Sequence, residues 1–251
     1  MGGYMNTATA ENKVMYISQA ENFSKIPGSP IAYWVSQALF NIFDNCGVLE
    51  NKTVCAAGVS SGDNDKYLKL WYEVPSTDIL FNSKTNDDFH FSRYKFAPCN
   101  KGGSFRKWYG NNEYVAYWAK ADEFHRNGST YSELLFKAGM SWSAISTYKF
   151  NGRYYPVGYL FDHASPSLFA KNKEQLMSFI ALANSNVGQL LLTIINPTIN
   201  TGADSLRKIP VSEEMLNNIQ VEEITEHCIK ISKADWDSFE PSWDFKKHPL
   251  I

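Results

Sequence analysis

A cluster of cations without acids is the part of this sequence best equipped to do chemistry. Between Ser92 and Gly110 there is no Asp or Glu, and the cations are Arg93, Lys95, Lys101, Arg106 and Lys107. Glycines at 102, 103 and 110 free the backbone to approach a partner closely. Lysine and arginine neutralise phosphates, and an arginine fork can also bind the edge of guanine. Asn111 and Asn112 follow directly, and an asparagine amide matches the edge of adenine.

Two interpretations of residues 101–118 are open. In one, the stretch is a loop that grips a DNA backbone and probes a groove. In the other, it is a solvated hairpin that buries Trp108, Tyr109 and Tyr114 in the core. Polar, aromatic-flanked loops at 60–66 and 147–153 favour a binding surface and add the candidates Asn64, Lys66, Lys149 and Arg153. Sugars also stack on aromatic rings, so the residues alone indicate a binding module for DNA, carbohydrate or protein.

Catalytic motifs are weak by comparison. The sequence has no G-x-G-x-x-G, no G-x-x-x-x-G-K-[ST] and no H-E-x-x-H. Asp63 and Asp65 suggest a metal loop, but no glutamate follows at the spacing of a Ca²⁺ loop, so a plain turn is favoured. The run "DHASPS" at 162–167 brings Asp, His and Ser together at a spacing that does not fit a triad on one strand. A residual nuclease that uses the two aspartates remains an alternative.

Composition indicates a folded protein of the cytoplasm. The chain has 251 residues, of which 44% are hydrophobic and 20% charged, enough for one large or two small domains. Residues 1–210 have 20 Lys and Arg against 17 Asp and Glu, whereas the remainder has 4 against 9, which together give the net charge of -2. Four scattered cysteines favour a reducing compartment. No apolar run reaches the roughly 18 residues of a membrane span, so we expect no membrane partner.

The helices and strands expected to position these loops indicate an α+β fold. We expect helices over 29–45, with Ser29 as the cap, and over 130–139, and short strands within 53–65, 88–98, 112–119 and 141–162. Two helices are expected to meet near Asn184–Ser185, ahead of a polar helical tail. The expected organisation is a lead with an artificial or truncated start at 1–21, a β-rich body at 22–171, a helical bridging segment at 172–211 and an acidic helical tail at 212–251.

Several segments in order resemble one family of enzymes. They are "NFSKIPGSPIAYWVS", "GVSSGDNDKYLKLWYEV", "KGGSFRKWYGNNEYVAYW", "GMSWSAISTYKF", "NSNVGQLLLTIINPTIN" with "LRKIPV", and "DWDSFEPSWDFKKHPLI". Together they resemble the C-terminal half of the adenine-specific DNA methyltransferases of bacteriophage-exclusion (BREX) systems and of related type II restriction–modification enzymes. The resemblance extends from Asn22 to Ile251. The segments "HASPS" and "TGADS", which begin at His163 and Thr201, depart from the family pattern.

The resemblance implies a β-rich target-recognition domain, similar to those of type I specificity subunits, with a helical C-terminal part. Its expected function is to recognise a DNA sequence for an N6-adenine methyltransferase in phage defence. The implied partners are double-stranded DNA and the methyltransferase catalytic domain or other defence-system subunits, and phage inhibitors that mimic DNA would use the same basic loops. The expected DNA contacts are Asn64, Lys66, Lys101, Arg106, Lys107, Asn111, Asn112, Lys149 and Arg153. The family's N-P-P-[YFW] motif is absent, so we expect S-adenosylmethionine to bind only in the catalytic half and this chain not to be catalytic by itself.

Overall fold

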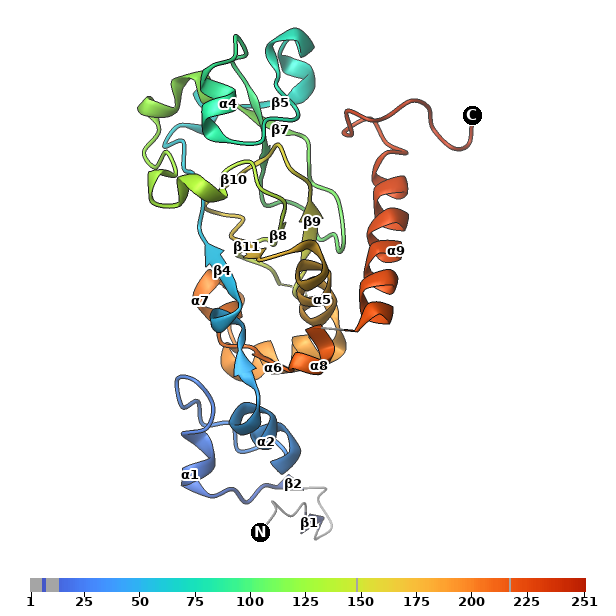
Figure 1. The fold of residues 1–251 in the computed structure, drawn as a ribbon. Helices are drawn as coiled ribbons and strands as arrows, with labels where there is room; N and C mark the ends of the chain where they lie inside the picture. Colours follow the sequence, from blue (N-terminus) through green and yellow to red (C-terminus); the bar gives the residue numbers. More distant parts are fainter. Residues whose placement is uncertain (1–5, 8–13, 148, 217) are drawn as a thin grey trace.

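The structure is a computed structural model that describes residues 6–7, 14–147, 149–216 and 218–251 (Figure 1). Its α-helices are α1 (Ala20–Phe23), α2 (Gln37–Asn45), α3 (Asn64–Tyr67), α4 (Asn86–His90), α5 (Lys173–Asn184), α6 (Asn186–Ile195), α7 (Ala203–Arg207), α8 (Glu213–Leu216) and α9 (Ile219–Trp236). Its strands are β1 (Asn6–Thr7), β2 (Val14–Met15), β3 (Gly47–Val48), β4 (Thr53–Ala56), β5 (Leu68–Leu70), β6 (Ala97–Asn100), β7 (Tyr114–Ala116), β8 (Gly139–Ser141), β9 (Arg153–Tyr155), β10 (Leu160–Phe161), β11 (Ser167–Ala170) and β12 (Pro210–Val211). Short 3₁₀ helices occupy 49–51, 71–73, 76–78, 118–123 and 129–134.

Two four-stranded sheets organise the chain, which confirms the predicted α+β class. The first sheet has the order β4-β11-β8-β9 and is antiparallel throughout. The second has the order β10-β6-β7-β5, in which only the β10–β6 pair is parallel. Two short pairs, β1–β2 and β3–β12, complete the pairing of the named strands.

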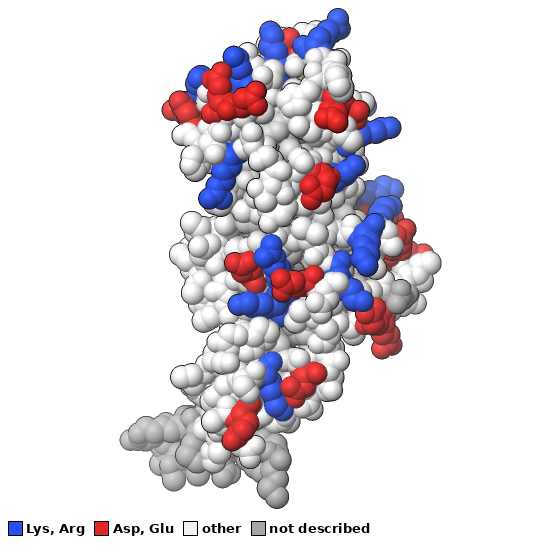
Figure 2. Space-filling model, turned by 60° about the vertical axis from the view of Figure 1, so that its left-hand side comes forward, with Lys and Arg blue, Asp and Glu red and all other residues white. Residues whose placement is uncertain are grey.

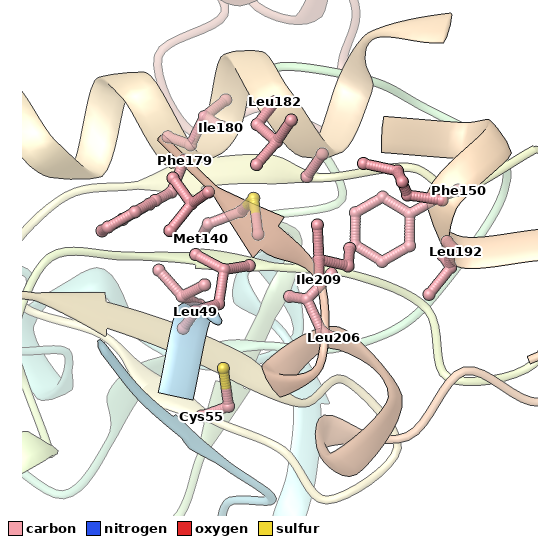
Figure 3. Close-up of a cluster of buried hydrophobic side chains, with 14 of the residues drawn as sticks. Leu49, Cys55, Met140, Phe150, Phe179, Ile180, Leu182, Leu192, Leu206 and Ile209 are labelled. Atoms are coloured by element: carbon pink, nitrogen blue, oxygen red, sulfur yellow. The ribbon is translucent and has the colours of Figure 1, made fainter. Parts of the chain in front are cut away.

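The first sheet separates two hydrophobic cores. Because side chains alternate along a strand, Cys55, Met140 and Leu168 face one core, and Ala56 and Phe169 face the other. The first core is closed by helices α2, α5, α6 and α7, as Figure 3 shows for Phe179, Ile180 and Leu206. The second core contains Tyr155 and Phe169 from the opposite face of the same sheet, together with the aromatic side chains of the second sheet and its connections.

The C-terminal helix joins the two halves of the molecule. In Figure 1 α9 stands beside α5, which is its main contact. The segment after it continues to the second sheet, where the Trp71 Nε1 group donates to the carbonyl of Pro241 at 2.9 Å. The Trp243 ring lies 5.1 Å from Phe81 and 5.7 Å from Tyr159, measured between ring centroids. The acidic tail is therefore a packed part of the fold.

The predicted pair of helices near Asn184–Ser185 is confirmed. Asn172 caps α5 by accepting from the Gln175 backbone amide at 2.9 Å, and Ser185 caps α6 by accepting from Gly188 at 2.9 Å. Among the described residues no single helix is long and apolar enough to cross a membrane. Helices α5 and α6 pass that test only as a pair, and they are bent by 72° at their junction.

Three local predictions are wrong. The helix expected from Ser29 begins only at Gln37, because Ser29 has the left-handed φ of 48° instead of the extended backbone of an N-cap. The helix expected over 130–139 is a broken 3₁₀ segment, and Gly139, expected just beyond its end, is the first residue of β8. The strand expected within 88–98 begins inside helix α4, which Thr85 caps by accepting from the Asp88 amide at 3.1 Å. Only its last residues belong to β6.

Candidate nucleic-acid interface

Loop 60–66 is fastened to two segments that are distant in sequence. The Ser60 amide donates to the carbonyl of Arg126 at 2.9 Å, and the Arg126 amide donates back to Ser60 at the same distance. The His163 amide donates to the carbonyl of Val59 at 2.8 Å. Asp63 caps α3 by accepting from the Lys66 amide at 3.1 Å, so a short helix begins where a plain turn was expected. Residues 125–126 and 162–165 therefore lie beside the first predicted loop.

Residues 101–103, at the start of the glycine-rich stretch 101–118, lie against the same segments. The Gly103 amide donates to Ser143 Oγ at 3.3 Å, and a side chain on Gly102 would meet the Ala164 carbonyl. The Ala144 amide donates to that same Ala164 carbonyl at 3.1 Å. At 3.4 Å the side chain added at Gly102 would make an ordinary van der Waals contact, so Gly102 marks where the two segments touch.

The third predicted loop extends this surface toward α6. The Ser146 amide donates to Ile199 at 3.0 Å, and the Thr201 amide donates to the Ala144 carbonyl at 2.7 Å. Part of the predicted loop, Tyr148, lies outside the described residues. We use the term loop face for the connected segments 60–66, 101–103, 125–126, 143–147, 162–165 and 198–201. Both segments in which the sequence departs from the family pattern contribute to it.

Lys101, in the loop face, and Lys149, just beyond it, are two predicted cations whose positions fit contact with a partner. Lys101 is partly exposed and lies over the Tyr114 ring, with Nζ 5.2 Å from the ring centroid. Lys149 is exposed beside a hollow of about 520 Å³ that is also lined by Ser146, Thr147 and Gln189. Burial lowers the pKa of Lys107, and the nearby charge of Lys149 lowers it further. The Lys107 Nζ group donates to the carbonyl of Asn184 at 2.9 Å.

Asn64 and Lys66 lie at the α3 end of the loop face. Both are exposed. Asn64 Oδ1 accepts from Ser61 Oγ at 2.7 Å, which leaves its amide nitrogen directed elsewhere. Lys66 Nζ forms an ion pair with Glu123 at 2.9 Å, and Glu123 also accepts from Tyr67. An exposed ion pair of this kind exchanges readily for a phosphate contact, because it is worth little in water.

Three predicted contact residues are buried, and this corrects the expectation that they contact DNA. Asn111 and Asn112 are each 2% exposed and Arg153 is fully buried. Asn111, at a left-handed φ of 59°, donates from Nδ2 to the carbonyl of Ser104 at 2.9 Å. Asn112 Oδ1 accepts from Asn100 at 3.1 Å. Asn111 Nδ2 and Asn112 Oδ1 are thus occupied within the protein, and Asn112 Nδ2 is buried without a hydrogen-bond partner.

Arg106 is also placed away from the loop face, against the chain's own C-terminal helix. Its guanidinium lies 5.0 Å from the centre of the Trp236 ring and 3.6 Å from the Asp235 carboxylate. Lys233 Nζ lies 5.4 Å from the centre of the Tyr109 ring. Helix α9 thus covers residues 106–110 of the glycine-rich stretch. The hairpin interpretation holds for Tyr109, which is buried.

Replacing Arg106 with alanine is expected to loosen the end of α9 and to leave DNA binding nearly unchanged. The lost ion pair is partly exposed, at 33% and 65% for the two side chains, so with the cation–π contact the loss of stability is at most about 1 kcal/mol. Hydrogen exchange over residues 230–240 and duplex titration would measure the two effects. A loss of DNA affinity equal to that of Lys101→Ala, with unchanged exchange in α9, contradicts this assignment.

Charge is dispersed over the side of the molecule shown in Figure 2. Blue and red side chains alternate there, separated by wide uncharged areas. Within the described part of the chain, no three His, Cys, Asp or Glu side chains gather so as to hold a metal ion. Asp162, at the base of the loop face, is buried, which raises its pKa, and its carboxylate accepts from the Ala164 amide at 2.8 Å. The carboxylate therefore shapes the turn at 162–165.

Arg126 and His163 belong to the loop face, and sequence reasoning named neither of them as a DNA contact. Both are exposed, and Arg126 Nη1 lies 3.4 Å from His163 Nδ1. They are isolated in the sequence and 37 positions apart, so no local pattern indicates that they meet.

Fold and loop face together define an α+β module with one surface made of polar loops. Along nearly its whole length this chain matches a segment of adenine-specific methyltransferases. It is 34% identical over 250 residues to "Adenine-specific methyltransferase PglX" of Lacticaseibacillus casei (strain Zhang), covering 94% of this chain and 20% of that protein. It is 36% identical over 235 residues to "Adenine-specific methyltransferase BrxX" of Escherichia coli O9:H4 (strain HS), covering 92% of this chain and 18% of that protein. The chain spans about a fifth of the length of these relatives. No protein-family model matches it.

Proposed function

We propose that this chain is the DNA target-recognition module of a prokaryotic N6-adenine DNA methyltransferase that acts in phage defence in the cytoplasm. The observation that carries the proposal is the match, along nearly the whole chain, to a segment of adenine-specific methyltransferases. The loop face supports it, because polar loops on a rigid scaffold are the usual means of reading a ligand. S-adenosylmethionine would bind outside this chain, in the catalytic part, and defence-system subunits are further proposed partners.

In this proposal Lys101 and Lys149 contact DNA phosphates at and beside the loop face. Lys107 adds its positive charge beside Lys149. Asn64 is the proposed base-reading amide, because it is exposed at the edge of the loop face. Lys66 turns from Glu123 to the DNA backbone. Asn111, Asn112, Arg106 and Arg153 are assigned no DNA contact.

The first test is selection of bound sequences from a randomised duplex pool, followed by titration across a salt series. The expected result is an enriched asymmetric motif that contains an adenine. In the Lys101→Ala, Lys149→Ala double variant, the slope of log affinity against log salt is expected to fall by about 1.8, or about 0.9 per lost phosphate contact.

Lys230→Ala is the matched control, because Lys230 is exposed on α9 away from the loop face. Equal slopes for wild type, control and double variant would remove the loop face from the proposal. Salt-sensitive binding without an enriched motif would mean that reading requires the catalytic part. No binding at low salt would reject DNA as the ligand.

A second candidate function, binding of carbohydrate or protein, is favoured by one observation. Trp71, Tyr72, Pro241 and Phe245 line a hollow of about 430 Å³ where the C-terminal segment meets β5. Tyr72 is 58% exposed there, and exposed aromatic rings offer stacking surfaces. Glycan-array binding that is lost in Tyr72→Ala, in a chain that binds no DNA, would support this candidate.

A further inference from the structure

Arg153 is a buried arginine for which no ion pair is formed among the described residues. It is fully buried in β9, and no Asp or Glu in the described part of the chain lies within 4 Å of its guanidinium. Burial lowers its pKa to about 10, and the charge of Glu113 opposes that shift. The side chain therefore still carries its charge at neutral pH. Arginine is almost never fully buried unless it is paired, so this position needs a reason.

The guanidinium of Arg153 connects the loops of the loop face from below. Its Nη1 atom reaches Ser143 Oγ at 3.4 Å, and its Nη2 atom reaches Ser165 Oγ at 3.5 Å. Ser143 Oγ in turn contacts both the amide and the carbonyl of Gly103, each at 3.3 Å. Ser165 Oγ lies 3.2 Å from Asn100 Oδ1 and 3.0 Å from the carbonyl of Trp142. Arg153 thus contacts segments 143–147 and 162–165 directly, and segment 101–103 through Ser143.

The backbone of Arg153 is held on both sides, which makes it a fixed anchor. On one side Arg153 pairs with Ser141 of β8. On the other, the Trp108 amide donates to Gly152 at 2.9 Å and the Tyr154 amide donates to Trp108 at 2.8 Å. A planar guanidinium donates in two directions from one position, whereas a lysine ammonium cannot span two acceptors in the same way.

Arg153 is costly for stability. Its Nε atom makes no hydrogen bond, and neither does the nearby Ser141 Oγ. A buried charge without full hydrogen bonding destabilises a fold. Violations of this kind concentrate at functional sites, and the loops that Arg153 joins are those of the proposed DNA interface.

We propose that Arg153 is a positioning residue, which holds these three loops in the arrangement that discriminates the target sequence and contributes a fixed positive charge beneath them. The proposal rests on the proposed function, and it assigns Arg153 a role in specificity without contact to DNA. It separates Arg153 from Lys101 and Lys149, whose loss weakens binding to all sequences alike.

Two variants and a matched control test this role. Arg153→Lys keeps the charge and loses the fork, and Arg153→Met loses both. The control is Ile180→Val or Ile180→Ala, whichever lowers Tm by the same amount as the arginine variant. Ile180 suits this purpose because it is buried in the core on the other side of the first sheet. Ser165→Ala, which removes the hydroxyl that Arg153 Nη2 contacts together with that hydroxyl's own contacts to Asn100 and Trp142, replaces either arginine variant that does not fold.

The first readout is amide hydrogen exchange of the chain without DNA. Exchange at 101–103 and 162–165 is expected to rise at least tenfold in the arginine variants and to stay unchanged in the control of equal Tm. If amide exchange in these loops rises only as much as in the control, Arg153 is a structural residue and the proposal is wrong. This readout holds even if the chain binds no DNA, in which case the proposed function fails separately.

The second readout is the ratio of affinities for the selected duplex and a scrambled duplex. Arg153→Lys is expected to reduce this ratio about tenfold while binding to the scrambled duplex stays within about twofold. A parallel loss on both duplexes, with an unchanged ratio, would overturn the role in discrimination.

Discussion

Replacing Trp236 with alanine is expected to lower the free energy of unfolding by about 3–5 kcal/mol, the range for truncation of a large aromatic side chain in a core. Trp236 is the last residue of α9 and is only 4% exposed. Its ring packs on Arg106 and next to Gly110. Truncation therefore removes the contact that attaches the C-terminal helix to the glycine-rich stretch.

Thermal and denaturant unfolding would measure the loss, and hydrogen exchange at 104–110 would show that this segment is uncovered. Ile231→Ala is the matched control, because Ile231 lies on the same helix and is 56% exposed. Its effect is expected to stay within about 0.5 kcal/mol. Equal effects of the two substitutions would show that α9 does not depend on Trp236 for its attachment.

The contact between α9 and the glycine-rich stretch also explains why sequence composition misjudged part of the site. Cations, aromatic rings and glycines are expected where a loop binds a polyanion, and equally where a loop binds an acidic helix of its own chain. Arg106 satisfies the second description, because Asp235 and Trp236 come from a helix 130 positions away. No local pattern distinguishes the two cases.

Elements set by local signals could be predicted, and those set by distant contacts could not. Helices α5 and α6 carry their own caps, Asn172 and Ser185, and an apolar period, so their junction was predicted within a residue or two. By contrast, the burial of Arg153 depends on β8 and on Trp108, which flank it only in the folded sheet. The loop face as a whole depends on backbone contacts between segments far apart in sequence, such as 60 with 126 and 146 with 199.

At the base of the loop face, replacing Gly58 with alanine is expected to cost about 3 kcal/mol, the upper part of the usual range for overpacking. A Cβ atom at Gly58 would lie 1.8 Å from the Phe161 carbonyl oxygen and 2.5 Å from the Phe161 ring. That carbonyl already accepts from the Val59 amide at 2.8 Å. The two backbones must separate to admit the methyl group, and the hydrogen bond between them is lost.

For a chain of this size a loss of about 3 kcal/mol corresponds to a fall in Tm of roughly 6–12 °C. Gly202→Ala is the matched control: nothing lies within 4 Å of its added Cβ, and its φ of −75° suits alanine. Gly202 is the N-cap of α7, where alanine is less favourable than glycine, so the control is expected to cost no more than about 1 kcal/mol. Because Val59 and Asp162 pair next to Gly58, the substitution also separates loop 60–66 from 162–165, and discrimination between duplexes should fall with Tm. A Gly58→Ala chain with unchanged Tm would show that the two backbones do not approach this closely.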